Sequence, residues 1–151
     1  MSPLSFMLPL AALLAATALP LQAAINAQLA RGVGSPILAA AISFAAGSVV
    51  LALVAAVFVR GLPSVGEMMK TPLWLFVTGG ALGTLYVTGN VILAPKLGAA
   101  TLFSFAIAGQ LLAALVLDKF GLLGLAVREL SLGRVAGAVL VLVGALMVRL
   151  L

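Results

Sequence analysis

Long apolar runs alternate along the chain with short segments that carry its charges. Five runs contain no Asp, Glu, Lys or Arg: Met1–Ala30, Gly32–Val59, Thr71–Pro95, Leu97–Leu117 and Val135–Val148. A helix that crosses the hydrocarbon of a bilayer needs about 20 apolar residues. The first four runs meet this requirement, and the fifth meets it if the side chains of Arg134 and Arg149 extend outward to the membrane surface.

The pattern therefore predicts an all-α, polytopic membrane protein with five transmembrane helices. The spans are expected at about residues 4–30, 36–59, 72–93, 98–117 and 132–150, in a single transmembrane domain that covers residues 1–151. The lipid bilayer is thus the first expected partner.

The segments between the runs have the composition of turns. Arg31–Pro36 combines glycines with Ser35 and Pro36, which suit the end of one helix and the start of the next. Gly61–Pro72 is polar, and Ala94–Gly98 is short enough for a tight reversal. In the longest connection, the apolar stretch Gly121–Val127 is too short to span and is expected to lie in the membrane interface.

Composition supports the membrane assignment and excludes several kinds of chemistry. Hydrophobic residues make up 65% of the chain and charged residues 7%, with no histidine, no cysteine and three acids. This removes disulfides, most metal sites and any catalysis by Cys or His. We therefore expect no enzyme activity, no metal and no cofactor. The net charge of +5 is scattered over loops, which suits anionic lipid and does not indicate nucleic-acid binding.

The charges leave the orientation in the membrane open. Five spans place five basic residues on the face of the N-terminus and three on the other face, a weak bias by the positive-inside rule. Both a single orientation and a dual topology fit this count. The segment Leu19–Ala24 loosely resembles a signal-peptidase site, but no Lys or Arg precedes its apolar core, so we expect no cleavage.

Polar residues inside the spans are candidates for a solute path, because such groups are costly in hydrocarbon. Gln22 and Asn26 share one helical face, as do Tyr86 and Asn90, and Gln110 lies near the middle of the fourth span. These five side chains are the candidate lining of a substrate site. The alternative is that the amides only join helices by hydrogen bonds.

Other residues are assigned to helix shape and packing. Pro20 inside the first span permits a kink, and Gly79 and Gly83 are expected to help the third span bend. Gly137 and Gly144 share a face of the last span and are a candidate dimer seam. The hydroxyls are expected to bond their own helix backbone, at Ser43, Ser48, Thr84 and Thr88. No carboxylate lies within a charge-free run, which disfavours cation–proton exchange.

Several segments of the chain form a recognisable set of motifs. The segment LQAAINAQL at residues 21–29 precedes RGVGSP at 31–36 and ISF at 42–44. Further along are APKLGAAT at 94–101, AGQL at 108–111 and DKFG at 118–121. Together these motifs resemble the YdcZ-like family of bacterial inner-membrane proteins, in the drug/metabolite transporter superfamily. The second half also resembles one EamA-type repeat, which has an acid at a helix end followed by a Leu-Ser or Leu-Thr pair. Asp118 matches the acid, and Leu130 and Ser131 match the pair. Gln110 lies where that repeat commonly has a proline.

The resemblance implies a function and an assembly. EamA-type transporters hold two inverted five-helix halves, whereas this chain has spans for one. It implies an inner-membrane transporter that moves a small polar metabolite or drug by alternating access, as an antiparallel homodimer or with a close paralogue. The alternative is a membrane protein that serves assembly or regulation and transports nothing.

Overall fold

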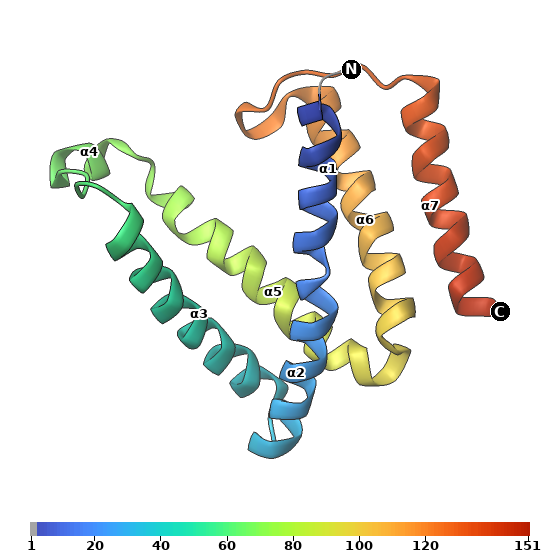
Figure 1. Ribbon diagram of the computed structural model, residues 1–151, viewed down its shortest axis with the longest axis horizontal. Coiled ribbons are helices and arrows are strands. Elements are labelled where there is room, and N and C mark those ends of the chain that lie inside the picture. Colours follow the sequence, from blue (N-terminus) through green and yellow to red (C-terminus); the bar gives the residue numbers. More distant parts are fainter. Residues whose placement is uncertain (1–2) are drawn as a thin grey trace. The chain divides into compact units, whose positions relative to one another are not determined.

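The computed structural model describes residues 3–151 and is helical, with no strand in that range (Figure 1). The helices are α1 Pro3–Ala16, α2 Ala18–Val33, α3 Pro36–Phe58, α4 Val65–Lys70, α5 Leu73–Leu97, α6 Ala99–Phe120, the short 3-10 helix η1 Leu122–Gly124, and α7 Leu132–Leu150. The chain divides into two compact units, of which the first ends at Pro95 and the second comprises Lys96–Leu151.

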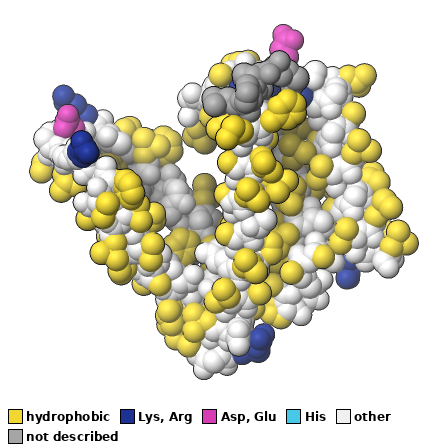
Figure 2. All heavy atoms as spheres, viewed as in Figure 1, with side chains coloured by type: hydrophobic (Ala, Val, Ile, Leu, Met, Phe, Trp, Pro, Cys, Tyr) yellow, Lys and Arg dark blue, Asp and Glu magenta, His cyan; other side chains and the backbone are white. Residues whose placement is uncertain are grey.

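The described residues contain five helical segments long and apolar enough to cross a membrane, as expected. They are Phe6–Val33, Pro36–Phe58, Leu73–Leu97, Ala99–Phe120 and Leu132–Leu150. Large apolar side chains are exposed along all of them, and Figure 2 shows hydrophobic side chains over the helices with the charges gathered at helix ends. Such a surface is stable where the surrounding solvent is lipid. The five-helix, all-α class is thus confirmed.

Pro20 coincides with a break in the first span. The helix is interrupted at Thr17, whose backbone N–H and hydroxyl both donate to the carbonyl of Leu14. Proline has no N–H to donate to the carbonyl four residues earlier, here that of Ala16, where α1 ends. The first span is therefore built from two helices, α1 and α2.

Three helix ends lie beyond the expected boundaries. The helix α2 continues to Val33 and is followed by Gly34. The helix α5 continues through Pro95 to Leu97, and Gly98, with φ of 78°, makes the reversal. The helix α6 runs to Phe120 and includes Asp118, so the connection to α7 is shorter than expected. In each case the helix is followed by a glycine, the residue that tolerates positive φ.

The polar connection between α3 and α5 contains a helix that the periodicity did not indicate. Ser64 accepts from the backbone N–H of Glu67, and the Glu67 carboxylate accepts from the N–H and hydroxyl of Ser64. This reciprocal capping box starts α4. The same bonds lower the pKa of Glu67 below its usual value of 4.5, with the backbone hydrogen bond as the main cause.

In the second unit, α6 and α7 pack against each other, and small side chains are among the residues that they bury. Ala108 on α6 and Ala138 and Ala145 on α7 are buried. Alanines allow two helix backbones to approach closely in lipid, where van der Waals packing replaces the hydrophobic effect as the driving force. The second unit is therefore a helical hairpin with alanines among its buried residues.

Candidate solute-binding site

The turn between α2 and α3 determines which residues of the two helices meet. Gly34 ends α2 in the left-handed conformation, with φ of 74°. Ser35 then caps α3 by accepting from the N–H of Leu38, and Pro36 occupies the first turn. The two helices fold back on each other, so residues equally far from this turn lie at the same depth.

Asn26 and Ser43 are such a pair, and they are hydrogen-bonded. The Nδ2 group of Asn26 donates to the Oγ of Ser43 over 3.2 Å. Asn26 is 3% exposed and Ser43 is half-buried. Polar groups inside a span are costly without a partner, and this bond supplies one for each residue.

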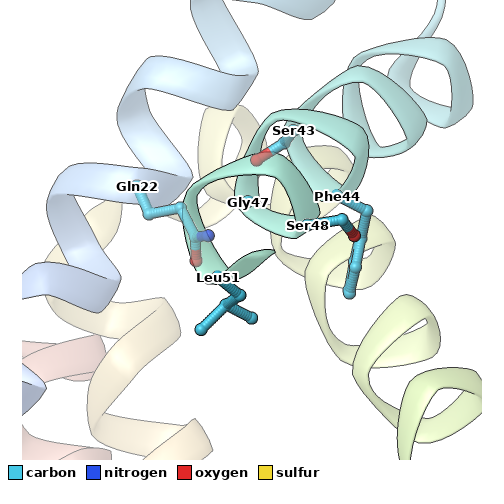
Figure 3. Close-up of a pocket in the computed structure, with 6 residues that line it drawn as sticks. All are labelled: Gln22, Ser43, Phe44, Gly47, Ser48 and Leu51. Atoms are coloured by element: carbon cyan, nitrogen blue, oxygen red, sulfur yellow. The ribbon is translucent and has the colours of Figure 1, made fainter. Parts of the chain in front are cut away.

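Next to this bond lies a cavity of about 200 Å³. Figure 3 shows Gln22 reaching from α2 toward α3, whereas Phe44 and Ser48 point from α3 toward α5. The lining residues are Gln22, Ser43, Phe44, Gly47, Ser48 and Leu51. The lining thus combines one amide and two hydroxyls with an aromatic and an aliphatic wall, and it carries no formal charge.

Several hydroxyls in the described spans bond their own helix, and one bonds a neighbouring helix. Thr84 donates to the carbonyl of Gly80, as expected from the sequence, and Thr78 and Ser104 bond their own helices in the same way. For Ser43 no such bond is present among the described residues, and its hydroxyl instead accepts from Asn26 on the neighbouring helix.

Phe44 forms a wall of the cavity and also contacts α5. A Cβ atom at Gly83 would lie 3.4 Å from the ring carbon Cζ of Phe44. Gly83 therefore gives the ring space, and α5 runs through this position as a continuous helix. Around Gly79, by contrast, a Cβ would meet nothing within 4 Å. The bending role expected for these two glycines stays a prediction.

The remaining candidate lining residues lie outside this cavity. Asn90 is 8% exposed, and Tyr86 is half-buried one turn before it on α5. Gln110 lies on α6, in the second unit, and is exposed. Tyr86 and Gln110 each have an interaction partner. The α2–α3 cavity thus accounts for Gln22 directly and for Asn26 through Ser43.

A second cavity, of about 410 Å³, lies beside α4 and the start of α5. Its lining is apolar throughout: Val65, Met68, Met69, Leu73 and Phe76. A lining without polar groups cannot orient a polar solute. The cavity between α2 and α3 is therefore the better candidate for a specific site.

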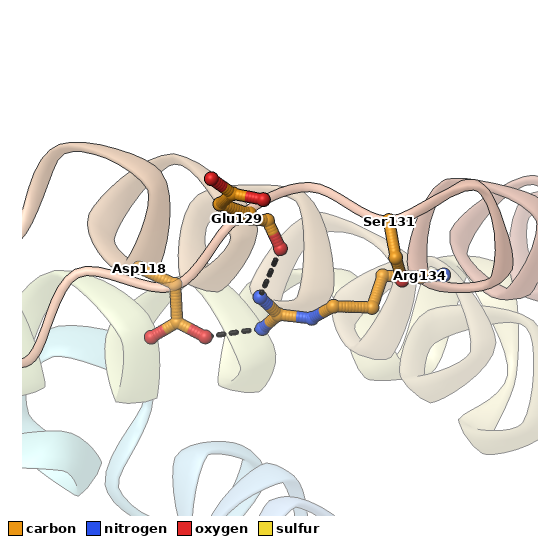
Figure 4. Close-up of polar contacts among 4 residues, drawn as sticks. All are labelled: Asp118, Glu129, Ser131 and Arg134. Carbon is orange, nitrogen blue, oxygen red and sulfur yellow. Dashed lines mark hydrogen bonds and ion pairs between the residues drawn. The ribbon is translucent and has the colours of Figure 1, made fainter.

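The acid carried over from the EamA-type repeat lies at the mouth of the α6–α7 hairpin. Asp118 forms an ion pair with Arg134, and both side chains are partly exposed, 25% and 32% respectively (Figure 4). Arg134 also donates to the backbone carbonyl of Glu129 over 3.3 Å, and the N–H of Arg128 donates to the carbonyl of Asp118. These contacts tie the loop to both helices and give Asp118 a structural role.

Sequence reasoning did not place Phe44, Gly47, Ser48 or Leu51 in the lining, and it assigned the Ser43 hydroxyl to its own helix backbone. A signal was available in the spacing about the Gly34–Ser35 turn. Asn26 pairs with Ser43 by this count, and Gln22 pairs with Gly47. Folding the two spans about the turn would have identified the serines beside the amides.

Comparison with known proteins places the chain among bacterial membrane proteins. The profile of the family described as "Putative inner membrane exporter, YdcZ" matches residues 7–147. A curated relative, the "Inner membrane protein YdcZ" of Escherichia coli (strain K12), is 34% identical over 91 residues. That alignment covers 60% of this chain and 60% of the relative. No solved structure matches the chain.

Proposed function

Because the chain belongs to the YdcZ family of multi-pass inner-membrane proteins, we propose that it is a transporter that moves a small polar metabolite or drug. The observation that carries this proposal is the uncharged polar cavity between α2 and α3. Polar groups inside membrane spans are rare and mark solute pathways when they line a cavity. An exporter family is also consistent with a protein that is not an enzyme.

The cavity suits a small neutral or zwitterionic solute. A dry cavity of about 150 Å³ holds a molecule as large as benzene, so this one accommodates about six to ten non-hydrogen atoms. Its amide and hydroxyls offer hydrogen bonds in place of those that the solute makes with water. Tyr86, Asn90 and Gln110 line the path during other steps of alternating access.

The proposed assembly is an antiparallel homodimer, or a pair with a close paralogue. In that design the site lies near the membrane midplane between inverted halves. Two features support it: the weak charge bias between the faces, and the half-exposed Gly137 and Gly144, where a Cβ atom would meet nothing within 4 Å. The alanines next to them, Ala138 and Ala145, already pack within the chain.

Transport is tested with inverted inner-membrane vesicles and a uniformly ¹³C-labelled extract of polar metabolites. Vesicles that contain the protein should accumulate at least one labelled compound above vesicles that lack it, as measured by mass spectrometry. Replacing Asn26 or Gln110 with Leu should remove this accumulation while the protein level in the membrane stays unchanged. Equal accumulation with and without the protein would favour the rival, a membrane protein of assembly or regulation.

Orientation tests the dimer proposal, since the native chain has no cysteine. Five spans place Gly32 and Gly66 on opposite membrane faces, so each receives a single cysteine, labelled from outside whole cells with an impermeant maleimide. An antiparallel dimer predicts that about half of the protein is labelled at each position, because the two copies insert in opposite orientations. Complete labelling at one position and none at the other would contradict the antiparallel homodimer and would require an oppositely inserted partner or a different mechanism.

A further inference from the structure

We infer that Asn26 is a positioning residue that makes the Ser43 hydroxyl a hydrogen-bond donor toward the α2–α3 cavity, so that the site selects neutral solutes bearing a carbonyl-type acceptor. This inference rests on the proposed function, because it names the solute class of the same site. Nothing in the composition of the chain requires it. It follows from the direction of one hydrogen bond.

The first step is the direction of that bond. A serine hydroxyl has one proton to donate and two lone pairs that accept. The Asn26 amide uses a lone pair of the Ser43 oxygen, so the Ser43 proton stays available. Within the described residues, that hydroxyl donates to no protein acceptor, unlike the hydroxyls of Thr78 and Thr84.

The second step is where the proton can go. Asn26 is buried and bonds the Ser43 hydroxyl, and Ser43 is also one of the residues that line the cavity. A donor left unsatisfied away from water carries a free-energy cost. A solute whose oxygen accepts from Ser43 removes that cost, whereas an alkylammonium cannot, because it has no lone pair to accept with.

The third step is the absence of a countercharge. The chain has three acids: Glu67 in the capping box of α4, Asp118 in the ion pair with Arg134, and Glu129 in the loop before α7. None of them lines the cavity. A cation there would have no carboxylate to balance its charge, so the cavity favours neutral solutes over it.

The test is protection of a pocket cysteine from alkylation. Leu51→Cys, in the otherwise cysteine-free chain, reacts with N-ethylmaleimide in nanodiscs, with and without a matched pair of solutes. N-Methylpyrrolidone has a carbonyl acceptor, and N-methylpyrrolidinium has nearly the same ring with a cationic donor. At twice its dissociation constant, the carbonyl solute should slow alkylation about threefold, and the cation should leave the rate unchanged.

Variants separate positioning from folding. Ser43→Ala and Asn26→Leu should each remove protection by N-methylpyrrolidone while the alkylation rate without solute stays the same. With Asn26 replaced, the Ser43 hydroxyl can turn to a carbonyl of its own helix. A merely structural role for Asn26 would instead change the rate without solute. Thr84→Val, on α5 and already bonded to its own helix, is the control that keeps protection.

The outcomes distinguish this inference from the proposed function. Equal or better protection by the cation, or protection that survives Asn26→Leu, would overturn it. If Leu51→Cys does not fold, Gly47→Cys gives the same measurement, because a Cβ there meets nothing within 4 Å. The alkylation experiment measures binding and does not depend on transport. If the carbonyl solute protects the cysteine but the vesicles take up no metabolite, only the transport proposal is contradicted. If the vesicles take up a metabolite but the carbonyl solute is not preferred, only this inference is contradicted.

Discussion

The hairpin of α2 and α3 and the hairpin of α6 and α7 place their polar contacts at different depths. The first joins its helices in mid-span by a hydrogen bond from Asn26 to Ser43. The second joins them in mid-span through alanines and has its ion pair, Asp118 with Arg134, at the loop end. The first turn is short and capped by Ser35, whereas the second is a longer loop held by that ion pair.

This difference indicates a division of labour between the hairpins. Where small apolar residues bring two backbones together, no cavity is needed and charges can stay at the membrane boundary. Where an amide and hydroxyls are placed in mid-span, the helices leave a cavity with unused hydrogen-bonding groups. The first hairpin is therefore the one that holds the candidate cavity, whereas the second holds its helices together by packing and by an ion pair at its loop end.

The largest effect on stability is expected from a larger side chain at the buried alanines of the α6–α7 contact. Ala145→Leu forces extra carbon atoms into a contact where Ala145 is 1% exposed, which should destabilise the protein by about 1–3 kcal/mol. The measurement is the thermal midpoint of the purified protein in detergent. Gly144→Ala is the control, because a Cβ at Gly144 meets nothing within 4 Å. Equal shifts of the thermal midpoint for both variants would mean that Ala145 does not lie in the contact between α6 and α7.

Breaking the ion pair should have the next largest effect. Asp118→Ala leaves Arg134 partly buried without its partner, and the expected loss is about 1–2 kcal/mol, between the values of exposed and buried pairs. Thermal midpoints at low and high salt measure it. Glu129→Ala is the matched control, since Arg134 contacts only the backbone carbonyl of Glu129. The double exchange of Asp118 and Arg134 should restore part of the loss.

Replacing Asn26 should affect stability less than either change. Hydrogen bonds between membrane helices contribute about 0.6 kcal/mol on average, so Asn26→Leu should lower the midpoint only slightly. Gln28→Leu, the same kind of change at an exposed position of α2, is the reference. A shift as large as that of Ala145→Leu would mean that Asn26 is a structural residue, and the contrast between the hairpins would fail.

The smallest effect concerns the capping box of α4. Ser64→Ala should raise the pKa of Glu67 toward 4.5, because the Ser64 hydroxyl no longer donates to the carboxylate. A lowered pKa means that the charged carboxylate stabilises α4. That contribution is present above pH 4.5 and is lost as the pH falls through the native pKa. A carboxyl NMR titration of both proteins measures the difference, and identical titration curves would contradict it.

The sequence predicted the spans well because each depends on local composition. Charge-free runs of sufficient length become helices wherever lipid is the solvent, and glycines such as Gly34 and Gly98 mark the turns. The helix α4 was missed, although Ser64 and Glu67 have the spacing of a capping box. A search for caps in the polar connections would have found it.

The site was predicted only in part because it depends on contacts between helices. Gln22 and Asn26 were recognised as unusual residues, but the sequence did not show that Asn26 faces Ser43 or that Gln22 borders a cavity. The role of Ser43 changes with its neighbour, since the same hydroxyl can bond its own helix or another one. Such a choice is decided by packing, which single-helix patterns do not contain.

The central claim, that the cavity between α2 and α3 binds the transported solute, is tested most directly by one matched pair of variants. Gln22→Leu changes a cavity residue, and Gln28→Leu makes the same substitution on the same helix outside the cavity. The measurement is uptake of ¹³C-labelled metabolites into inverted vesicles at equal protein levels. We predict that uptake is lost with Gln22→Leu and retained with Gln28→Leu. Retained uptake with Gln22→Leu, or equal loss with both variants, would contradict the claim.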